Sequence, residues 1–218
     1  MGQKVNPHGF RLGKLYSWKS KWFAKKQDYK NFVLEDFKLR QFLQNQLKLA
    51  GLIKVEIERS INTIKIILFV SRPGVVIGRG GSGLEVLKKM INQKLNINPA
   101  DSKHIKVDLE VVEVKNADSS AQIICQRLVD QLIKRYPQRR AVAMAMDRAI
   151  SSGAKGIKVV LAGRIAGAEI SRREKYNRGT VPLQTLRADI DYCQMPALTK
   201  SGYIGIKVYV YKREEEIK

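Results

Sequence analysis

The stretch Gly78-Arg79-Gly80-Gly81 combines residue types and spacing that suit contact with a phosphate backbone. Glycine has no Cβ, so another chain can come close to the backbone at these positions. A helical pattern opens at Ser82, and the first N–H groups of a helix, together with its positive dipole end, attract phosphates. Arg79 adds a guanidinium between the glycines. We therefore predict that this loop binds nucleic acid.

The elements around the loop must hold it at the start of a helix. Apolar periodicity predicts a helix over 36–50, followed by strands over 53–58 and 62–71. After the loop it predicts a helix from residue 82 and a third strand over 105–111. This order resembles the type II KH domain, in which a GxxG loop clamps a single-stranded nucleic acid. We predict such a domain over residues 36–115.

The helix after the loop carries its own start signal and extra positive charge. Ser82 and Glu85 have the spacing of a capping box, with Ser82 as the N-cap. Lys88 and Lys89 lie on this helix and are further candidates for phosphate contact. The sequence 98–101, Asn-Pro-Ala-Asp, is expected to end the helix.

The same glycines also permit two other interpretations. Gly78, Gly80 and Gly83 fit the dinucleotide motif GxGxxG, which would make the chain an enzyme. That motif needs a direct passage from strand to loop and an acidic residue at the end of the next strand. Here a Pro-Gly pair interrupts the passage, and the nearest acidic candidate, Asp101, precedes the strand. A tight turn without a ligand is the remaining alternative.

Composition favours nucleic acid as the partner. The 218 residues carry 41 Lys and Arg against 20 Asp and Glu, a formal net charge of +21, and are 44% hydrophobic. So large an excess of positive charge repels itself in a compact fold unless a polyanion is close. An anionic membrane is less favoured, because the sequence has no long apolar span, signal peptide or lipidation motif.

Histidine and cysteine usage argues against metal, redox and nucleophilic chemistry. The two histidines, His8 and His104, and the two cysteines, Cys125 and Cys193, are far apart in the sequence. No metal-ligand spacing, catalytic triad or P-loop occurs. We therefore expect no enzyme activity, no cofactor, no metal and no small-molecule substrate, and structural cysteines in a reducing compartment.

The first 35 residues are predicted to form a basic arm. Residues 1–30 hold eight Lys and Arg and one acidic residue. Lys4 and Arg11 are candidates for nucleic-acid contact. Trp18 and Trp22 usually need a surface to bury against or a base to stack on. We expect the arm, with one short helix at most, to dock on RNA or on the protein's own core.

A second α+β unit is predicted over 116–211, followed by a tail at 212–218. Two helices and three or four strands are expected, over 119–136, 138–152, 156–165, 170–178, 183–192 and 203–211. In the third strand, Leu186, Ala188, Ile190 and Tyr192 should share one face. The pattern predicts two helices packed on a small sheet, an α/β sandwich.

Basic residues in this second unit are the other candidates for nucleic-acid contact. Arg139 and Arg140 open the second helix, where the helix dipole disfavours cations. Arg140 and Arg148 project away from the apolar stripe of this helix, and Arg139 lies at its edge. An arginine fork can bind two phosphate oxygens. A solvated face is the alternative explanation. Further candidates follow along the chain: Arg164, Arg172, Arg173, Lys175 and Arg178.

Segments spread along the whole chain resemble the bacterial-type small-subunit ribosomal protein three, the universal S-three family. They are 1–13, 72–78, 153–159, 163–164, 167–170 and, most specifically, 181–192. The resemblance implies a cytoplasmic structural protein of the small-subunit head. It implies binding to the 3′ domain of the small-subunit rRNA, contact with mRNA at the entrance of its channel, and neighbouring ribosomal proteins ten and fourteen.

The resemblance also implies a role for Arg139 and Arg140 in unwinding structured mRNA. The family continues with basic residues one turn later, where this chain has Ala143 and Met144. The family loop often carries lysines between its glycines, where this chain has Arg79 and Gly80. The alternative from another class is a free-standing KH protein that regulates translation by binding mRNA away from the ribosome.

Overall fold

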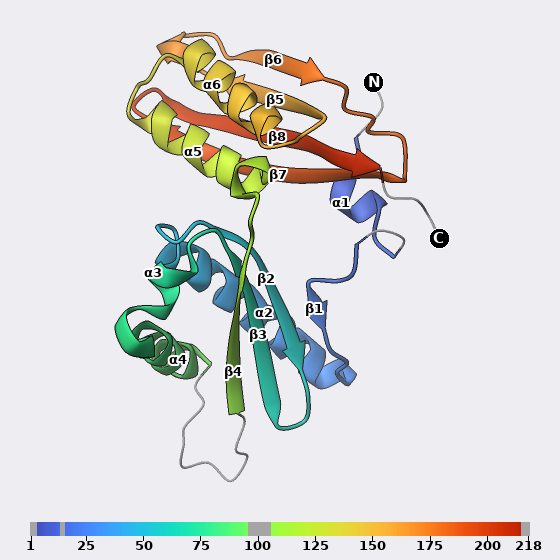
Figure 1. Ribbon diagram of the computed structural model, residues 1–218, viewed down its shortest axis with the longest axis vertical. Coiled ribbons are helices and arrows are strands. Elements are labelled where there is room, and N and C mark those ends of the chain that lie inside the picture. The colour runs from blue at the N-terminus through green and yellow to red at the C-terminus, as the bar shows by residue number, and fades with distance from the viewer. Residues whose placement is uncertain (1–3, 14–15, 96–105, 215–218) are drawn as a thin grey trace. The chain divides into compact units, whose positions relative to one another are not determined.

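The computed structural model describes residues 4–13, 16–95 and 106–214, and the chain forms two compact units (Figure 1). One unit is Trp18–Lys115, here called the KH unit. The other joins Met1–Ser17 to Asn116–Lys218 and is called the C-terminal unit. The N-terminal segment is therefore divided, because its first part belongs to the same unit as the C-terminal half of the chain.

The KH unit follows the predicted order of elements. Its helices and strands are β1 (Ser20–Lys21), α2 (Lys26–Gln46), β2 (Leu52–Arg59), β3 (Thr63–Val70), α3 (Pro73–Ile77), α4 (Ser82–Lys94) and β4 (Lys106–Glu113), and a 3-10 turn lies at Arg79–Gly81. The sheet order is β1-β2-β3-β4. Strand β3 pairs antiparallel with β2 and parallel with β4, and the short β1 runs parallel to β2.

The core of the KH unit comes from the predicted apolar faces. Leu39, Leu43 and Leu47 line one side of α2 and are buried. In β3 every second residue is buried, as expected for a strand with one face on the core. Helix α4 adds Leu87 and Ile91 to the same cluster. This mixed α/β arrangement confirms the predicted fold class for this half of the chain.

Two details of the KH unit differ from the sequence prediction. Helix α2 begins at Lys26, well before the predicted start at Asp36. Its first half is mostly exposed, so it lacks the buried apolar stripe of the second half, and Asp36 is buried well inside the helix. The capping box is also wrong: Gly81 is the N-cap of α4, and the Ser82 hydroxyl donates to the Arg79 carbonyl at 2.9 Å.

The C-terminal unit is a four-stranded antiparallel sheet with two helices on one face (Figure 1). Its elements are α1 (Pro7–Phe10), α5 (Ala121–Ile133), α6 (Gln138–Ser151), β5 (Gly156–Gly163), β6 (Arg172–Gly179), β7 (Ala188–Thr199) and β8 (Gly202–Glu214), with 3-10 turns at Ala117–Ser119 and Ile165–Gly167. The strand order is β6-β5-β8-β7. Helices α5 and α6 bury their apolar stripes against alternate residues of β5 and β8.

The strand predicted over 183–192 is placed differently in the structure. Strand β7 begins at Ala188 and continues to Thr199. Leu186 lies outside it and is partly exposed, and the pairing with β8 is irregular between Ala188 and Ile190. Residues before Ala188 form a loop, and the carbonyls of Pro182, Leu183 and Thr185 there bind a buried side chain, Arg11, instead of a neighbouring strand.

Candidate nucleic-acid interface

The glycine loop has the backbone that its sequence predicts. Gly78, Gly80 and Gly81 all have positive φ, at 69°, 61° and 83°. At Gly80 a Cβ would meet open space, so the glycine is needed for its backbone conformation and not for packing. Arg79 is exposed beside it. The loop therefore presents bare backbone and one guanidinium to the outside.

Close packing of two helices fixes the position of this loop. Helix α3 ends at Ile77 and α4 starts five residues later, and a Cβ on Gly83 would lie 2.5 Å from the Val76 carbonyl oxygen. Only glycine fits there. Within the described loop no side chain caps the start of α4, and the Ser82 N–H donates to the Arg79 carbonyl, which leaves the N–H groups after it without a side-chain cap. This geometry can hold a phosphate.

The helix α3, which lies between strand β3 and the glycine loop, argues against the dinucleotide-binding interpretation. A GxGxxG motif requires the strand to run directly into the glycine turn. Here Pro73–Ile77 forms a helix between β3 and the loop. Asp101 lies outside the described residues. The loop thus has the helix–GxxG–helix form of a KH domain.

Lys88 and Lys89 differ in what surrounds them on α4. The Lys88 ammonium lies 3.9 Å from an Asp108 carboxylate oxygen on β4, which partly neutralises it. Lys89 is exposed. Of the two, Lys89 therefore has the charge better placed for an external phosphate.

The predicted arginines of α6 are exposed at its start. Val142 and Ala149 are buried against the core of the unit, which confirms the predicted apolar stripe. Arg139 and Arg140 both face solvent, and no acidic residue lies in the first helical turn. Arg148 is exposed near the end of α6, in a small hollow toward α5.

The register of β6 divides the predicted basic cluster between two faces of the sheet. Arg172 and Arg178 lie on the side of α6: Arg172 Nε is 3.0 Å from Glu174, and Arg178 pairs with Asp147 of α6. Tyr176 lies between them, and burial and its hydrogen bond to Glu174 raise its pKa, against the opposing effect of nearby Arg139.

Arg173 and Lys175 alternate with those residues and lie on the opposite face. The structure therefore brings Arg139 and Arg172 to one side of the sheet and takes Arg173 and Lys175 to the other. One cluster in the sequence becomes two surfaces in the fold.

Arg164 lines a hollow of about 470 Å³ beside the start of α6. Its Nε donates to the Ala168 carbonyl at 2.9 Å. Arg135 and Lys200 line the same hollow, although they are far from Arg164 in the sequence. Sequence reasoning missed these two residues, because nothing in the local pattern indicates that the turns carrying them meet.

Comparisons with known proteins agree with this arrangement. The KH domain family matches residues 38–119, and the family "Ribosomal protein S3, C-terminal domain" matches residues 128–210. Small ribosomal subunit protein uS3 of Clostridium acetobutylicum is 45% identical over 98% of this chain and 93% of its own length. The protein of the same name from Desulfosudis oleivorans is 47% identical over 98% of this chain and 96% of its own length.

The chain belongs to the uS3 family of small ribosomal subunit proteins. The predicted resemblance is thereby confirmed, and so is the fold class of a KH domain followed by an α/β domain. The uS3 family is a family of ribosomal proteins, whose role is structural.

One residue that was predicted to contact nucleic acid, Arg11, is instead buried inside this uS3 family member. Arg11 is 1% exposed, and its guanidinium donates to the carbonyls of Ala188, Thr185 and Leu183 at 2.7, 2.9 and 3.1 Å. It also binds the Pro7 carbonyl at 3.0 Å. The prediction that Arg11 contacts nucleic acid is therefore wrong, since its donors are used inside the fold. Lys4, by contrast, is exposed.

Over residues 4–13, 16–95 and 106–214, no group of three or more His, Cys, Asp or Glu side chains could hold a metal ion. Within the same ranges, no helix has the length and apolar character needed to cross a membrane.

Proposed function

We propose that this chain is a structural constituent of the small ribosomal subunit head. It binds the 3′ domain of the small-subunit rRNA, lies beside ribosomal proteins ten and fourteen, and lines the entrance of the mRNA channel. Membership of the uS3 family carries this proposal. The exposed arginine pair at the start of α6 supports the contact with mRNA.

The mechanism is electrostatic. Arg139 and Arg140 each present a planar fork that binds two phosphate oxygens. They hold one strand of the incoming message, which favours the single-stranded form over a hairpin in front of the ribosome. Ala143 and Met144 leave the next turn of α6 without positive charge, so the effect depends on these two side chains.

The pair Arg139→Ala and Arg140→Ala tests the contact with mRNA. Both side chains are exposed, so assembly into subunits should be unchanged. Removing two phosphate contacts of about 0.5 kcal/mol each should slow translation through a stable hairpin about fivefold. The measurement is the elongation time of a hairpin message relative to an unstructured one.

Lys25→Ala with Lys26→Ala is the matched control. It also removes two adjacent, exposed basic residues at a helix start, but in the KH unit. The control should not alter hairpin transit. Equal transit times for the arginine variant and the unaltered chain would refute the unwinding role.

The glycine loop is tested by Arg79→Asp with Gly80→Asp. Asp tolerates the left-handed backbone of Gly80, so the loop should keep its shape while its charge reverses. Affinity for a labelled single-stranded RNA should fall about tenfold or more, with a salt dependence weaker by about 0.7 for each phosphate that the loop no longer binds. Fluorescence anisotropy at several salt concentrations measures both.

The control pair is Arg79→Asn with Gly80→Asn. Asparagine also adopts the left-handed backbone conformation of Gly80, but it adds no negative charge. It should cause a smaller loss of affinity than the Asp pair. If neither pair changes RNA affinity, the loop has a structural role only.

A further inference from the structure

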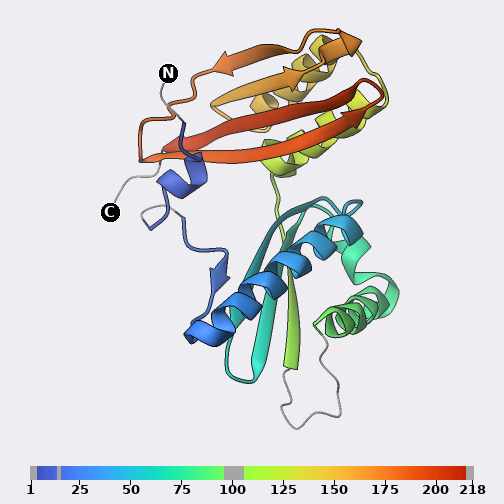
Figure 2. The ribbon, with the colours of Figure 1, turned by 180° about the vertical axis from the view of Figure 1, so that it is seen from behind.

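The face of the C-terminal sheet away from α5 and α6 is built of regular rows of side chains. Figure 2 shows the sheet from behind, with α1 near one end. Strand register sets three rows across β6, β5, β8 and β7, namely Arg173, Ala162, Gly205 and Pro196; Lys175, Val160, Lys207 and Gln194; and Asn177, Lys158, Tyr209 and Tyr192. We call this surface the open sheet face.

The charge on the open sheet face is of one sign. Its rows contain Arg173, Lys175, Lys158 and Lys207, and none of the twelve residues is acidic. Partial burial lowers the pKa of Lys158, and the nearby charges of Lys4, Lys175 and Arg173 lower it further. The fold thus holds several cations close together, an arrangement that an external anion would stabilise.

The other face of the same strand provides a contrast. There Arg172 pairs with Glu174 and Arg178 pairs with Asp147. Strand β6 therefore carries arginines with carboxylate partners on one side and a basic surface without acidic residues in its rows on the other. Neutralisation inside the fold accounts for the first set but not for the second.

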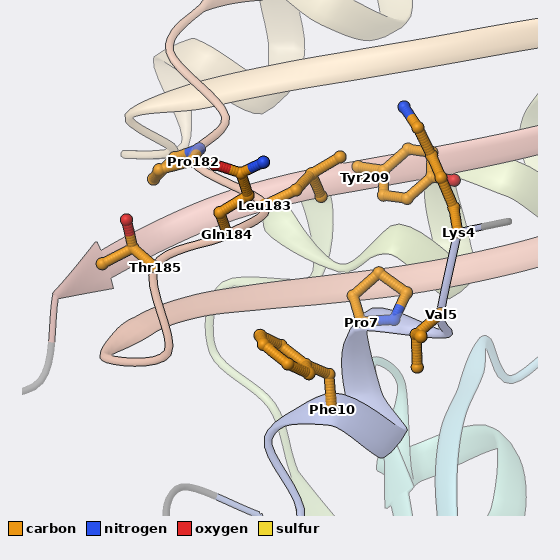
Figure 3. A pocket seen from close by; sticks show the side chains of 9 residues that line it. All are labelled: Lys4, Val5, Pro7, Phe10, Pro182, Leu183, Gln184, Thr185 and Tyr209. Atoms are coloured by element: carbon orange, nitrogen blue, oxygen red, sulfur yellow. The ribbon is translucent and has the colours of Figure 1, made fainter. Parts of the chain in front are cut away.

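A pocket of about 580 Å³ adjoins the open sheet face. Figure 3 shows its lining side chains, which come from the N-terminal segment, the loop before β7 and strand β8: Lys4, Val5, Pro7, Phe10, Pro182, Leu183, Gln184, Thr185 and Tyr209. Tyr209 lies directly across from Lys158 in the strand register, and Lys4 is the charged residue of the lining. The pocket is thus continuous with the basic rows.

We infer that the open sheet face binds an RNA strand, with phosphates on Lys158, Lys175 and Lys207 and one unpaired base in the pocket beside Phe10 and Tyr209. Aromatic rings stack on any base, and basic rows follow the backbone. The pocket volume lies within the range of about 300–1,000 Å³ that is usual for small ligands.

The charge of the surface is the reason to infer RNA as the occupant. A protein partner would need to bring several carboxylates to the same rows, whereas every nucleotide of an RNA strand carries a negative charge. Small residues, Ala162 and Gly205, lie side by side in the first row, so a backbone can approach the sheet closely there. This inference rests on the proposed function, because it names a surface that would contact RNA in the ribosome.

The first test is the pair Lys158→Gln with Lys207→Gln in the full chain. Binding of a fluorescein-labelled oligouridylate, measured by anisotropy, should weaken about tenfold, and its salt slope should fall by about 1.4 because two phosphates are no longer bound. Lys26→Gln with Lys134→Gln is the matched control, since it removes two exposed lysines that lie away from the open sheet face. The control should leave the salt slope unchanged, and an unchanged thermal midpoint shows that each variant folds.

The second test locates the base. RNA containing 4-thiouridine should cross-link under light to peptides that contain Phe10 or Tyr209, and Phe10→Leu should reduce the yield at both. Leucine keeps the pocket apolar but removes one aromatic ring. Cross-links at the glycine loop alone would overturn the inference about the pocket.

These results are distinguishable from a failure of the proposed function. If the chain sediments with small subunits but the Lys158 and Lys207 variant binds RNA normally, the open sheet face is not an RNA surface and the ribosomal role stands. If that variant instead loses capture of purified ribosomal protein ten or fourteen while its RNA binding is unchanged, the occupant is a protein and the inference is wrong.

Discussion

Each of the two units binds its own part of the N-terminal segment through a buried charge, and the two charges have opposite signs. In the KH unit, Asp36 is 2% exposed and accepts hydrogen bonds from Ser20 Oγ at 2.8 Å and Trp22 Nε1 at 2.9 Å. Its other oxygen accepts from Arg59 at 2.6 and 3.0 Å. In the C-terminal unit, the buried cation Arg11 donates to backbone carbonyls of the loop before β7.

The two buried charges, Asp36 and Arg11, differ in the groups that stabilise them. Asp36 is neutralised by another side chain, Arg59, which is itself nearly buried. Arg11 is held mainly by carbonyl dipoles, so the loop around it must keep its conformation for the charge to be satisfied. A basic chain therefore uses one of its arginines inside the fold, and composition alone does not distinguish it from arginines that meet RNA.

Removing the charge of Asp36 should have the largest effect on stability. Asp36→Asn removes the buried carboxylate that pairs with the nearly buried Arg59 and leaves it only the more exposed Glu35, which should lower the unfolding free energy by about 3 kcal/mol. Both tryptophans, Trp18 and Trp22, belong to the KH unit. Urea unfolding followed by tryptophan fluorescence therefore measures this unit.

Glu35→Gln is the control for that experiment. Glu35 binds the same Arg59 at 2.7 Å, but its side chain is 39% exposed. The Glu35→Gln substitution should lower the unfolding free energy by less than about 1 kcal/mol. Equal losses of stability for the two variants would contradict the view that burial makes the Asp36 pair important.

Arg11→Lys should have the next largest effect. One ammonium cannot reach all the carbonyls that the guanidinium binds, so the C-terminal unit should be less stable by about 2 kcal/mol. Near-ultraviolet circular dichroism of the tyrosines can follow this unit. Arg164→Lys, at an exposed arginine that also binds one carbonyl, should cost less than about 0.5 kcal/mol.

Tyr16→Phe should have the smallest effect, and it should depend on pH. Burial and a hydrogen bond to Asp189 raise the pKa of Tyr16 above its ordinary value of 10.0. A raised pKa means that the folded state holds its proton longer, so this stabilisation is complete below pH 10 and is lost as the pH rises further.

At neutral pH the variant should be less stable by about 1 kcal/mol, the value of one hydrogen bond. Above about pH 10 the unaltered chain should lose stability faster than the variant, by up to about 1.4 kcal/mol per pH unit. Guanidinium unfolding at a series of pH values measures this difference. Parallel curves for the two proteins would show that Tyr16 does not titrate differently in the folded state.

Much of the fold could be predicted from local pattern. The alternation in β3 and the stripes of α2 and α6 are short-range signals, and the structure has these elements near their predicted places. The start of α2 could not be predicted, because the first half of this helix is mostly exposed. The loop before β7 could not be predicted, because it depends on a distant partner: Arg11 binds its carbonyls across more than 170 residues of sequence.

The candidate site follows the same rule. The glycine loop is local, so its residue types reveal its backbone. The basic cluster on β6 is also visible in the sequence, but its division between two faces appears only once the strand register is known. Lys158 and Lys207 could not be predicted as RNA-binding residues, since they gain neighbours of like charge only when β5 and β8 pair.

The central claim is that this chain works as part of the small ribosomal subunit. The most direct test is a cell lysate run on a sucrose gradient in moderate salt, with this chain followed by an antibody or a tag. The account predicts that the chain sediments with small subunits and stays there after a salt wash. A chain found only at the top of the gradient would contradict the account and favour a free-standing RNA-binding regulator.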